Sequence, residues 1–185
     1  MSPFPAGVVI RLVAQDEDLV ALTAMIHAAY APHAARGLRF WGTHQSVADT
    51  ARRLASGRAW VVCNGDRYVG AATLRPPQPD SAVPLYRQAG IYTLSQFCVC
   101  PTLKGTGLGK ALHAHVLAEA EALGALGLAL DTAQPASGLI ALYEAWGYTV
   151  VGRCDWRPDT NYESVVMYQP VRLHAAPSLS GCRLT

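Results

Sequence analysis

A glycine-rich stretch that follows an uncharged segment is the part of this sequence best suited to chemistry. Residues 104–110 read Lys-Gly-Thr-Gly-Leu-Gly-Lys. The glycines allow a tight turn, and the free N–H groups of the loop and of the next helical turn would point toward one spot. The positive end of the helix dipole adds to them, and the chain's two lysines, Lys104 and Lys110, flank the loop. The pattern predicts a binding site for an anion such as a phosphate.

Spacing excludes two common kinds of glycine loop. A P-loop needs a glycine five residues before its Gly-Lys pair and a Ser or Thr after it, but these positions hold Lys104 and Ala111. The dinucleotide fingerprint, counted from Gly105, would need its third glycine at Lys110. Nucleotide binding through this loop is therefore disfavoured.

The segments around the loop carry a family resemblance. Residues 91–100 are uncharged and mostly apolar, which is typical of a buried strand, and Pro101 ends that strand. Residues 139–148 read Leu-Ile-Ala-Leu-Tyr-Glu-Ala-Trp-Gly-Tyr. Together with the loop, they resemble the two signatures of the GCN5-related N-acetyltransferase (GNAT) family over residues 8–169. Gly107 and Gly109 match the acyl-CoA motif, whereas Lys104 stands where the family has Arg or Gln.

The resemblance implies an acetyl-CoA-dependent N-acetyltransferase that transfers an acetyl group to the amine of a small molecule by direct attack in a ternary complex. Acetyl-CoA would be the cosubstrate, and no metal is expected. The backbone of residues 97–99 would pair with pantetheine, and the loop would hold the pyrophosphate. The implied cofactor-binding residues are Phe97, Cys98, Val99, Lys104, Gly105, Thr106, Gly107, Leu108, Gly109 and Lys110.

Tyr143 matches the family's tyrosine that protonates the CoA sulfur, because a phenol can donate to a thiolate of comparable basicity. The alternative is that its ring only packs on a helix face. The general base is not identified, since residues 91–100 contain no acid where many family members have a Glu. The candidates are Tyr92, Ser95, Gln96, His44 and Glu163. The missing acid favours an alternative function, a non-catalytic acyl-CoA-binding or regulatory module.

The resemblance also implies the walls of an acceptor pocket. These are residues 30–44, Tyr92 and Gln96, and residues 156–162. The segments are rich in Trp and Tyr and contain no cluster of acids, which favours a small, partly apolar or aromatic amine over a polycation.

Composition narrows the class of protein. The 185 residues suit one domain, and 51% hydrophobic with 15% charged residues is typical of a globular protein. A net charge of +2 gives no case for nucleic acid or a membrane surface as a partner. No apolar run approaches the roughly 20 residues of a spanning helix, and the N-terminus lacks signal-peptide features. We expect a cytoplasmic protein, and the family's frequent dimers suggest a homodimer.

The implied fold class is α/β, the GNAT fold, with a mixed and mostly antiparallel central sheet flanked by helices. Its order, β-α-α-β-β-β-α-β-α-β-β, agrees with local signals in this chain. These include a helix cap at Asp16, an end to that helix at about residue 31 before Pro32, and a capping box from Ser46 to Asp49. Asn64-Gly65 predicts a hairpin turn.

Three further expectations concern the loops, the domain limits and the cysteines. Residues 76–90 cannot continue a strand, so they would form a lid or a disordered excursion. Residues 1–170 would form a single acetyltransferase domain, and residues 171–185 a loose tail. The five cysteines are odd in number and predict no disulfide framework; a catalytic thiol at Cys98 is a lesser alternative.

Overall fold

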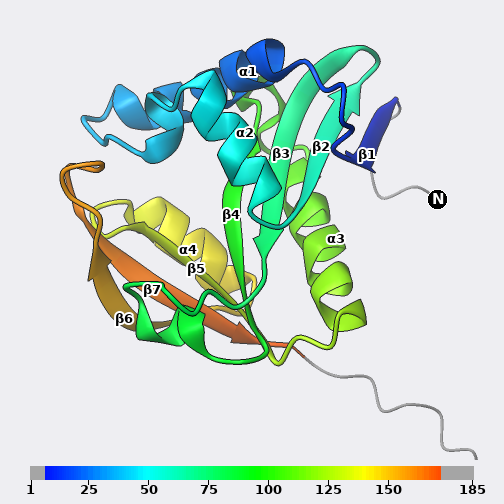
Figure 1. Ribbon diagram of the computed structural model, residues 1–185. Coiled ribbons are helices and arrows are strands. Elements are labelled where there is room, and N and C mark those ends of the chain that lie inside the picture. Colours follow the sequence, from blue (N-terminus) through cyan, green and yellow to red (C-terminus); the bar gives the residue numbers. More distant parts are fainter. Residues whose placement is uncertain (1–6, 172–185) are drawn as a thin grey trace, which may run out of the picture.

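A computed structural model of the chain describes residues 7–171 (Figure 1). The predicted tail, apart from Val171, lies outside the described residues. The elements follow the predicted order, and the connections carry three short 3₁₀ turns, Trp41–Thr43, Pro84–Arg87 and Pro101–Leu103. In chain order the strands and helices are β1 (Val8–Leu12), α1 (Leu19–Ala34), α2 (Val47–Ala55), β2 (Arg58–Asn64), β3 (Arg67–Arg75), β4 (Ile91–Val99), α3 (Leu108–Ala122), β5 (Gly127–Ala133), α4 (Ser137–Ala145), β6 (Thr149–Asp155) and β7 (Glu163–Pro170).

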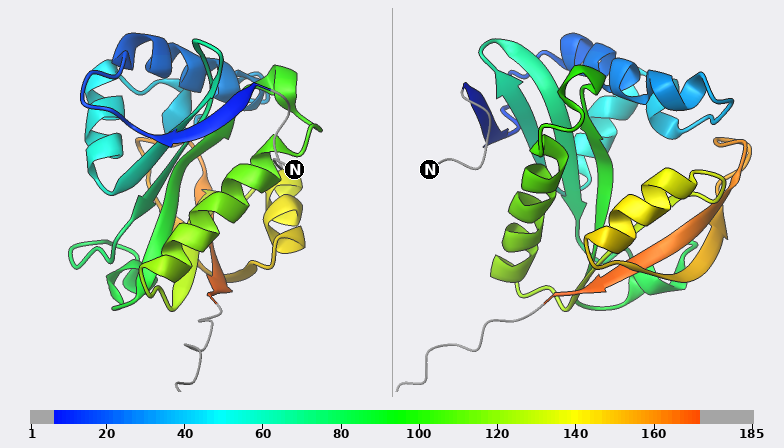
Figure 2. Two further views of the ribbon diagram at one scale, coloured as in Figure 1. Left: turned by 90° about the vertical axis from the view of Figure 1, so that its right-hand side faces the viewer. Right: turned by 180° about the vertical axis from the view of Figure 1, so that it is seen from behind.

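The strands form one sheet in the order β1-β2-β3-β4-β5-β7-β6. Only the central pair, β4 and β5, runs parallel, while the other five pairs are antiparallel. Helices α1 and α2 cover one face of the sheet, and α3 and α4 cover the other (Figures 1 and 2). The predicted fold class, a mixed and mostly antiparallel sheet flanked by helices, is confirmed.

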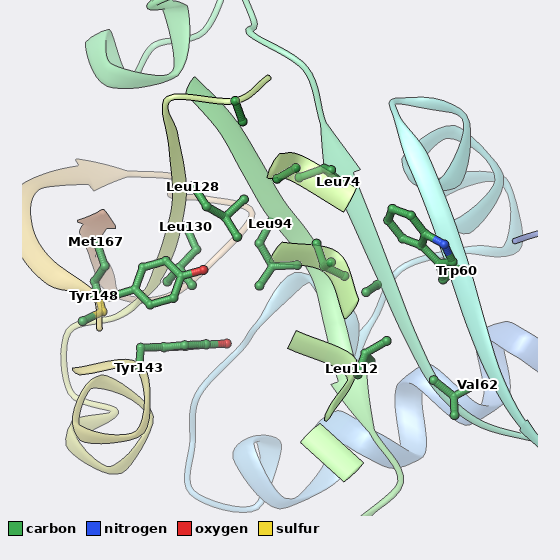
Figure 3. Packing of buried hydrophobic residues seen from close by; sticks show 14 of the residues in the cluster. Trp60, Val62, Leu74, Leu94, Leu112, Leu128, Leu130, Tyr143, Tyr148 and Met167 are labelled. Carbon is green, nitrogen blue, oxygen red and sulfur yellow. The ribbon is translucent and has the colours of Figure 1, made fainter. Parts of the chain in front are cut away.

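The main core lies between the sheet and the helices α3 and α4 (Figure 3). Leu112 of α3 and Leu128 of β5 are fully buried there, and Met167 of β7 joins them. Burial of each such side chain contributes about 2 kcal/mol relative to its exposure. The core therefore holds the two central strands and α4 in fixed positions.

Strand β4 is bulged next to its centre. Ala71 of β3 pairs with Cys98, and Thr73 pairs with Ser95. Between these two pairs β3 advances by two residues and β4 by three, so β4 has one extra residue. Gln96 lies in the bulge with φ 49°, the one positive φ of a non-glycine among residues 7–171. A bulge bends a strand and increases its twist. Pairing between β4 and β5 accordingly stops at Thr93 and Ala129, and beyond them each strand continues without pairing to the other.

The start of α1 differs from the prediction. Asp18, not Asp16, caps the helix, and its Oδ1 accepts from the N–H of Ala21 at 2.9 Å. Both aspartates suit the cap, so the sequence did not separate them. The helix also runs through Pro32 to Ala34, because a proline two residues before the end removes only one intrahelical bond.

Glu17, just before α1, makes an ion pair with Arg11 of β1. Its carboxylate accepts two hydrogen bonds from Arg11, at 2.7 and 2.8 Å, and one from the hydroxyl of Tyr68. The hydrogen bonds from Arg11 lower the pKa of Glu17 to about 2. These contacts join β1, the start of α1 and β3.

Removal of this charge should make the protein less stable in a pH-dependent way. Because the folded state lowers the pKa of Glu17, its contribution is present above about pH 4.5 and lost as the pH falls toward 2. Water partly screens the pair, so we expect Glu17→Gln to cost about 1 kcal/mol at pH 7. Urea unfolding at pH 7 and pH 3 measures this. An equal loss at both pH values would contradict the prediction.

The second helix and the first hairpin follow their predictions. Ser46 caps α2 and forms the complete capping box with Asp49. Strands β2 and β3 are joined at Gly65 and Asp66. Of the two alternatives for residues 76–90, the disordered excursion was wrong, because this connection is folded against the sheet and its Tyr86 is only 3% exposed; its role as a lid stays a prediction. Prolines end the strand there, but apolar and aromatic residues beyond them pack.

Three further findings concern a membrane-spanning helix, a metal site and the cysteine thiols. None of the helices within residues 7–171 is both long and apolar enough to span a membrane. Over the same residues, no three potential metal-binding side chains lie together. The four described cysteines are free thiols, while Cys182 lies outside the described part. Burial raises the pKa of the Cys98 thiol to about 12, which argues against a nucleophilic role.

Candidate active site

A cavity of about 1140 Å³ lies where β4 and β5 stop pairing. It extends from the glycine loop, along β4, to a polar wall between α2 and the end of β5. Two predicted residues do not line it: Leu108 is fully buried in the core, and the hydroxyl of Thr106 bonds to the carbonyl of Leu103. The predicted residues that line it are Phe97, Cys98, Val99, Lys104, Gly105, Gly107, Gly109, Lys110 and Tyr143.

The glycine loop has the geometry of an open cradle. Gly105 and Gly107 have φ of 80° and 84°, and a Cβ on either would meet nothing within 4 Å. Gly107 caps α3 without a side-chain bond, and the first helical bond comes from the N–H of Ala111. The N–H groups of Gly109 and Lys110 have no partner among the described residues. Two amides at the positive end of a helix are thus available to an anion.

Beyond the bulge, the backbone of β4 presents alternate groups to the opening. The N–H of Cys100 donates to the carbonyl of Val69 on β3 at 2.8 Å. Because the hydrogen-bonding direction alternates along a regular strand, the amide of Val99 points away from β3 and toward the opening. At the bulge, the carbonyl of Phe97 accepts from the hydroxyl of Tyr30, which lines the cavity, at 3.2 Å. The backbone of Cys98, paired with Ala71, points toward β3. Two of the three backbone positions predicted to pair with pantetheine therefore face the opening.

Tyr143 lies near the end of α4 with its ring directed toward β4 (Figure 3). The ring packs edge-on against Trp146 and Tyr148, at centroid distances of 5.6 and 5.8 Å. Among the described residues its hydroxyl has no hydrogen-bond partner. Burial raises the pKa of Tyr143, and the charge of Asp131 adds to this, so the phenol keeps its proton at neutral pH.

The candidate bases from the sequence separate into two groups. Ser95 and Gln96 line the cavity. Tyr92 packs against the main core, His44 is exposed and bonds to Thr43, and Glu163 pairs with Arg153. These last three are away from the cavity wall, so they are poor candidates for proton transfer there.

A carboxylate that sequence reasoning did not consider lies on the cavity wall. Asp131 follows the apolar part of β5, and its oxygens accept from the hydroxyl of Tyr86 at 3.0 Å and from the indole Nε1–H of Trp156 at 2.9 Å. Burial raises the pKa of Asp131, and the bonds from Trp156 and Tyr86 oppose the shift. The sequence could have indicated Asp131 as a candidate, because it lies near the carboxyl end of a strand parallel to β4, and ligands bind at that edge of parallel strands.

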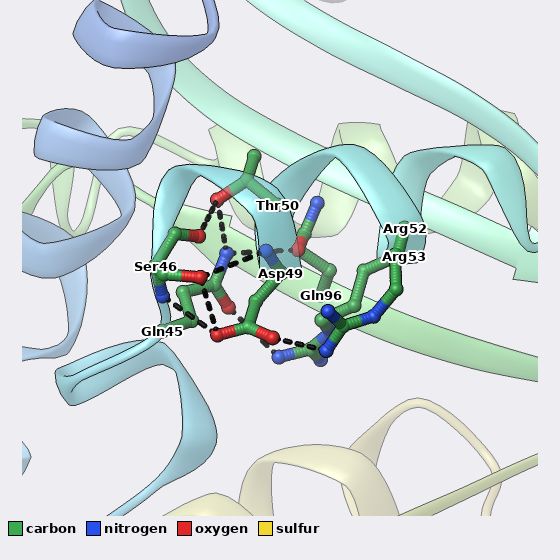
Figure 4. Close-up of polar contacts among 7 residues, drawn as sticks. All are labelled: Gln45, Ser46, Asp49, Thr50, Arg52, Arg53 and Gln96. Atoms are coloured by element: carbon green, nitrogen blue, oxygen red, sulfur yellow. Dashed lines mark hydrogen bonds and ion pairs between the residues drawn. The ribbon is translucent and has the colours of Figure 1, made fainter.

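A buried network behind the cavity fixes the side chain of Gln96 (Figure 4). Arg53 can only donate, and it bonds to Oε1 of Gln45 at 2.9 Å. The amide nitrogen of Gln45 must then be the group that donates to Thr50, at 2.7 Å, and to Oε1 of Gln96, at 3.1 Å. Nε2 of Gln96 is buried without a partner among the described residues. Gln96 thus keeps a free donor, and Arg53 is anchored at one nitrogen.

Some of the residues predicted to wall an acceptor pocket line the cavity away from the glycine loop. Residues from 30–42 and 156–162 line it, including Tyr30, Phe40, Trp41 and Tyr162, whereas Tyr92 does not. The prediction missed a polar patch formed by Arg53, Arg75 and Asp131 on the same cavity.

Comparison with known proteins adds to this geometry. The sequence model of the acetyltransferase (GNAT) family matches residues 23–148. The chain belongs to this family. No curated protein compared with the sequence matches it significantly.

Solved structures of GNAT acetyltransferases share the fold. The ribosomal-protein-S18-alanine N-acetyltransferase of Escherichia coli is 21% identical, with a TM-score of 0.67 over 94% of this chain and 99% of that one. A GNAT acetyltransferase of Elizabethkingia anophelis with acetyl-CoA bound is 12% identical, with a TM-score of 0.61 over 90% and 99%. A Bacillus subtilis acetyltransferase in complex with CoA is 15% identical, with a TM-score of 0.61 over 89% and 99%.

Proposed function

We propose that this GNAT protein transfers the acetyl group of acetyl-CoA to the amine of a small molecule that binds in the same cavity. The observation that carries the proposal is the position of the opening between β4 and β5. It joins the open glycine loop at one end to the buried Tyr143 and the partly buried carboxylate of Asp131 farther in. Structural neighbours with acetyl-CoA or CoA bound support the choice of cosubstrate.

The residues present fit the cosubstrate. The free amides of Gly109 and Lys110, together with the Lys104 and Lys110 side chains, would hold the pyrophosphate. The outward amide of Val99 and the backbone of Phe97 beside it would pair with the pantetheine arm. Bound acetyl-CoA supplies a reactive thioester, on which the amine displaces the sulfur.

The chain supplies a proton donor and a proton acceptor. Tyr143 holds a proton at its hydroxyl and would give it to the departing sulfur. Asp131 would take the proton that the amine loses, because burial raises its pKa and makes it a stronger base than an exposed aspartate. We assign the base to Asp131, since the other carboxylate on the cavity wall, Asp159, is exposed.

The preference for a small acceptor rests on how the cavity is closed. Tyr86 belongs to the connection before β4, and Trp156 to the one between β6 and β7, and both bond to Asp131. These bonds draw two connections over the end of β5. The aromatic walls at Phe40 and Tyr162, 5.0 Å apart between ring centroids, narrow the space further. A short, compact molecule suits such a space better than a polypeptide tail.

The test combines calorimetry with a turnover assay. We expect acetyl-CoA to bind with micromolar affinity, and a panel of small amines to release free CoA thiol at a rate that depends on amine concentration. Binding without turnover of any amine would instead favour the non-catalytic acyl-CoA-binding module. Absence of acetyl-CoA binding would contradict both.

Removal of the Tyr143 hydroxyl should slow turnover. We expect Tyr143→Phe to lower kcat about 100-fold and to leave acetyl-CoA affinity within about 3-fold, because the ring packing stays while the proton donor is lost. Tyr148→Phe is the matched control. It lies in the same ring cluster, and its hydroxyl bonds to His113 at 3.0 Å. This control should cost about 1 kcal/mol of stability with kcat unchanged. Equal kcat values for both variants would remove Tyr143 from the mechanism.

A further inference from the structure

Two arginines on the acceptor side of the cavity lack the partner that buried arginines usually have. Arg53 of α2 and Arg75 at the end of β3 both line the cavity and are partly buried. Neither forms an ion pair with an Asp or Glu in the described chain. Arg53 is held at one nitrogen by Gln45, and the buried Nε of Arg75 has no hydrogen-bond partner among residues 7–171.

The two guanidinium groups lie near enough to act on each other. Burial lowers the pKa of Arg75, and the charge of Arg53 lowers it further. Asp131 acts on both arginines in the opposite direction, but its oxygens are engaged by Tyr86 and Trp156. The patch therefore holds two cations against one anion, and partial burial of a cation without a bonded counterion is unfavourable. A ligand anion would relieve that cost.

This patch is separate from the predicted pyrophosphate site. Arg75 pairs in register with Thr93, whereas the glycine loop follows Cys100. Seven residues of extended strand span about 23 Å. Arg75 therefore lies at the opposite end of β4 from the glycine loop, while Arg53 lies between them, beside Gln45 and the bulge at Gln96.

The chemistry of the patch defines what it would bind. The fork of a guanidinium group matches the two oxygens of a carboxylate, and two such groups can share one carboxylate. Beside them, Asp131 is the base assigned above, which must meet the acceptor's amine. We propose that the acceptor is an amino carboxylate, such as an amino acid, whose carboxylate binds Arg53 and Arg75 while its amine meets Asp131. This inference rests on the proposed function and names its substrate class.

The other walls indicate the rest of the acceptor. Phe40 and Tyr162 form a buried apolar cluster with Ala133, and Trp41 lies on the same side of the cavity. An amino acid with an apolar side chain would place that side chain among them.

The experiment compares matched acceptors. A panel of free amino acids is assayed beside the carboxamide and the decarboxylated amine of each, with acetyl-CoA saturating. We expect kcat/KM for the best amino acid to exceed that of its amide and its amine by about 100-fold, because those analogues leave the guanidinium groups unpaired. Phosphorylated and sulfonated amines of similar size test for other anions.

Variants assign the effect to the arginines. We expect Arg75→Gln to lower kcat/KM for the amino acid about 100-fold but to change that of the amide by less than about 3-fold. Arg75→Lys, which keeps the charge and loses the fork, should be intermediate. Arg67→Gln is the matched control, since Arg67 lies exposed at the other end of β3. Arg53→Gln serves as a second test, with thermal unfolding to check its fold because Arg53 also bonds to Gln45.

The outcomes distinguish this inference from the proposed function. If the wild type binds acetyl-CoA and acetylates amides or decarboxylated amines as well as the acids, the inference fails while the proposed function stands. Preference for phosphorylated or sulfonated amines, or no turnover of any amino carboxylate, also overturns it. Loss of acetyl-CoA binding in calorimetry contradicts the proposed function itself.

Discussion

Replacement of Gly107 by glutamate is expected to weaken acetyl-CoA binding by at least about 100-fold. Gly107 has φ 84° and lies at the first residue before α3, with open space where a side chain would start. A glutamate there would place a negative charge beside the free amides of Gly109 and Lys110, where the pyrophosphate would bind. Like charges in close contact cost several kcal/mol, and about 2.7 kcal/mol is a factor of 100. Isothermal calorimetry with acetyl-CoA measures the loss.

Gly124→Glu is the matched control. Gly124 lies just beyond the other end of the same helix, with φ 74° and nothing within 4 Å of an added Cβ. Both substitutions force a side chain into a left-handed conformation, which costs about 1 kcal/mol of stability. We expect both variants to melt at similar temperatures and only the first to lose affinity. Equal affinity losses would mean that the effect comes from backbone strain and not from the anion site.

The architecture was predictable because its signals are local. Ser46 and Asp49 can satisfy each other across one helical turn wherever they occur, and Asn64-Gly65 favours its turn without help from distant residues. Where two residues were equally suited, as Asp16 and Asp18 were, local rules gave no choice. Tyr86 was missed for another reason: its burial depends on contact with β5, which comes much later in the chain.

The open conformation of the glycine loop was predictable to the same degree, and the shape and polar lining of the rest of the cavity were not. Glycine spacing marks the loop because the backbone conformation itself requires glycine. The bulge at Gln96 has no such mark, since a glutamine gives no hint of a positive φ. Arg53 and Arg75 resemble any surface arginine in sequence. Only the sheet register and the packing of α2 bring them to one cavity.

The position of Asp131 illustrates how a site can cost stability. Burial raises its pKa, so the folded state disfavours the charged form that the proposed proton transfer would need. The bonds from Tyr86 and Trp156 keep the carboxylate in place and limit the shift. A carboxylate held in this way is a stronger base than an exposed aspartate, and its burial lowers the free energy of unfolding of the protein. This reasoning gives opposite expectations for activity and for stability.

Asp131→Asn is expected to lower kcat/KM about 1000-fold while leaving acetyl-CoA binding unchanged, because the proton acceptor is lost and the CoA side of the cavity is untouched. In the wild type, activity should fall as the pH drops through the raised pKa of Asp131. The residual activity of the variant should not show this fall at acidic pH. The carbonyl of the new asparagine can still accept from Trp156, and its amide can donate to the Tyr86 oxygen.

The same substitution should make the protein more stable at neutral pH, by about 1 kcal/mol. Since the folded state raises the pKa of Asp131, wild-type stability falls as the pH rises from the unfolded value through the folded value. The asparagine does not titrate, so its advantage should grow across that window and stay constant above it. Urea unfolding from pH 3 to 8 measures this. Asp159→Asn, at the exposed carboxylate, should change neither activity nor the pH profile. A variant that loses activity and stability together would indicate that Asp131 serves the fold and not the reaction.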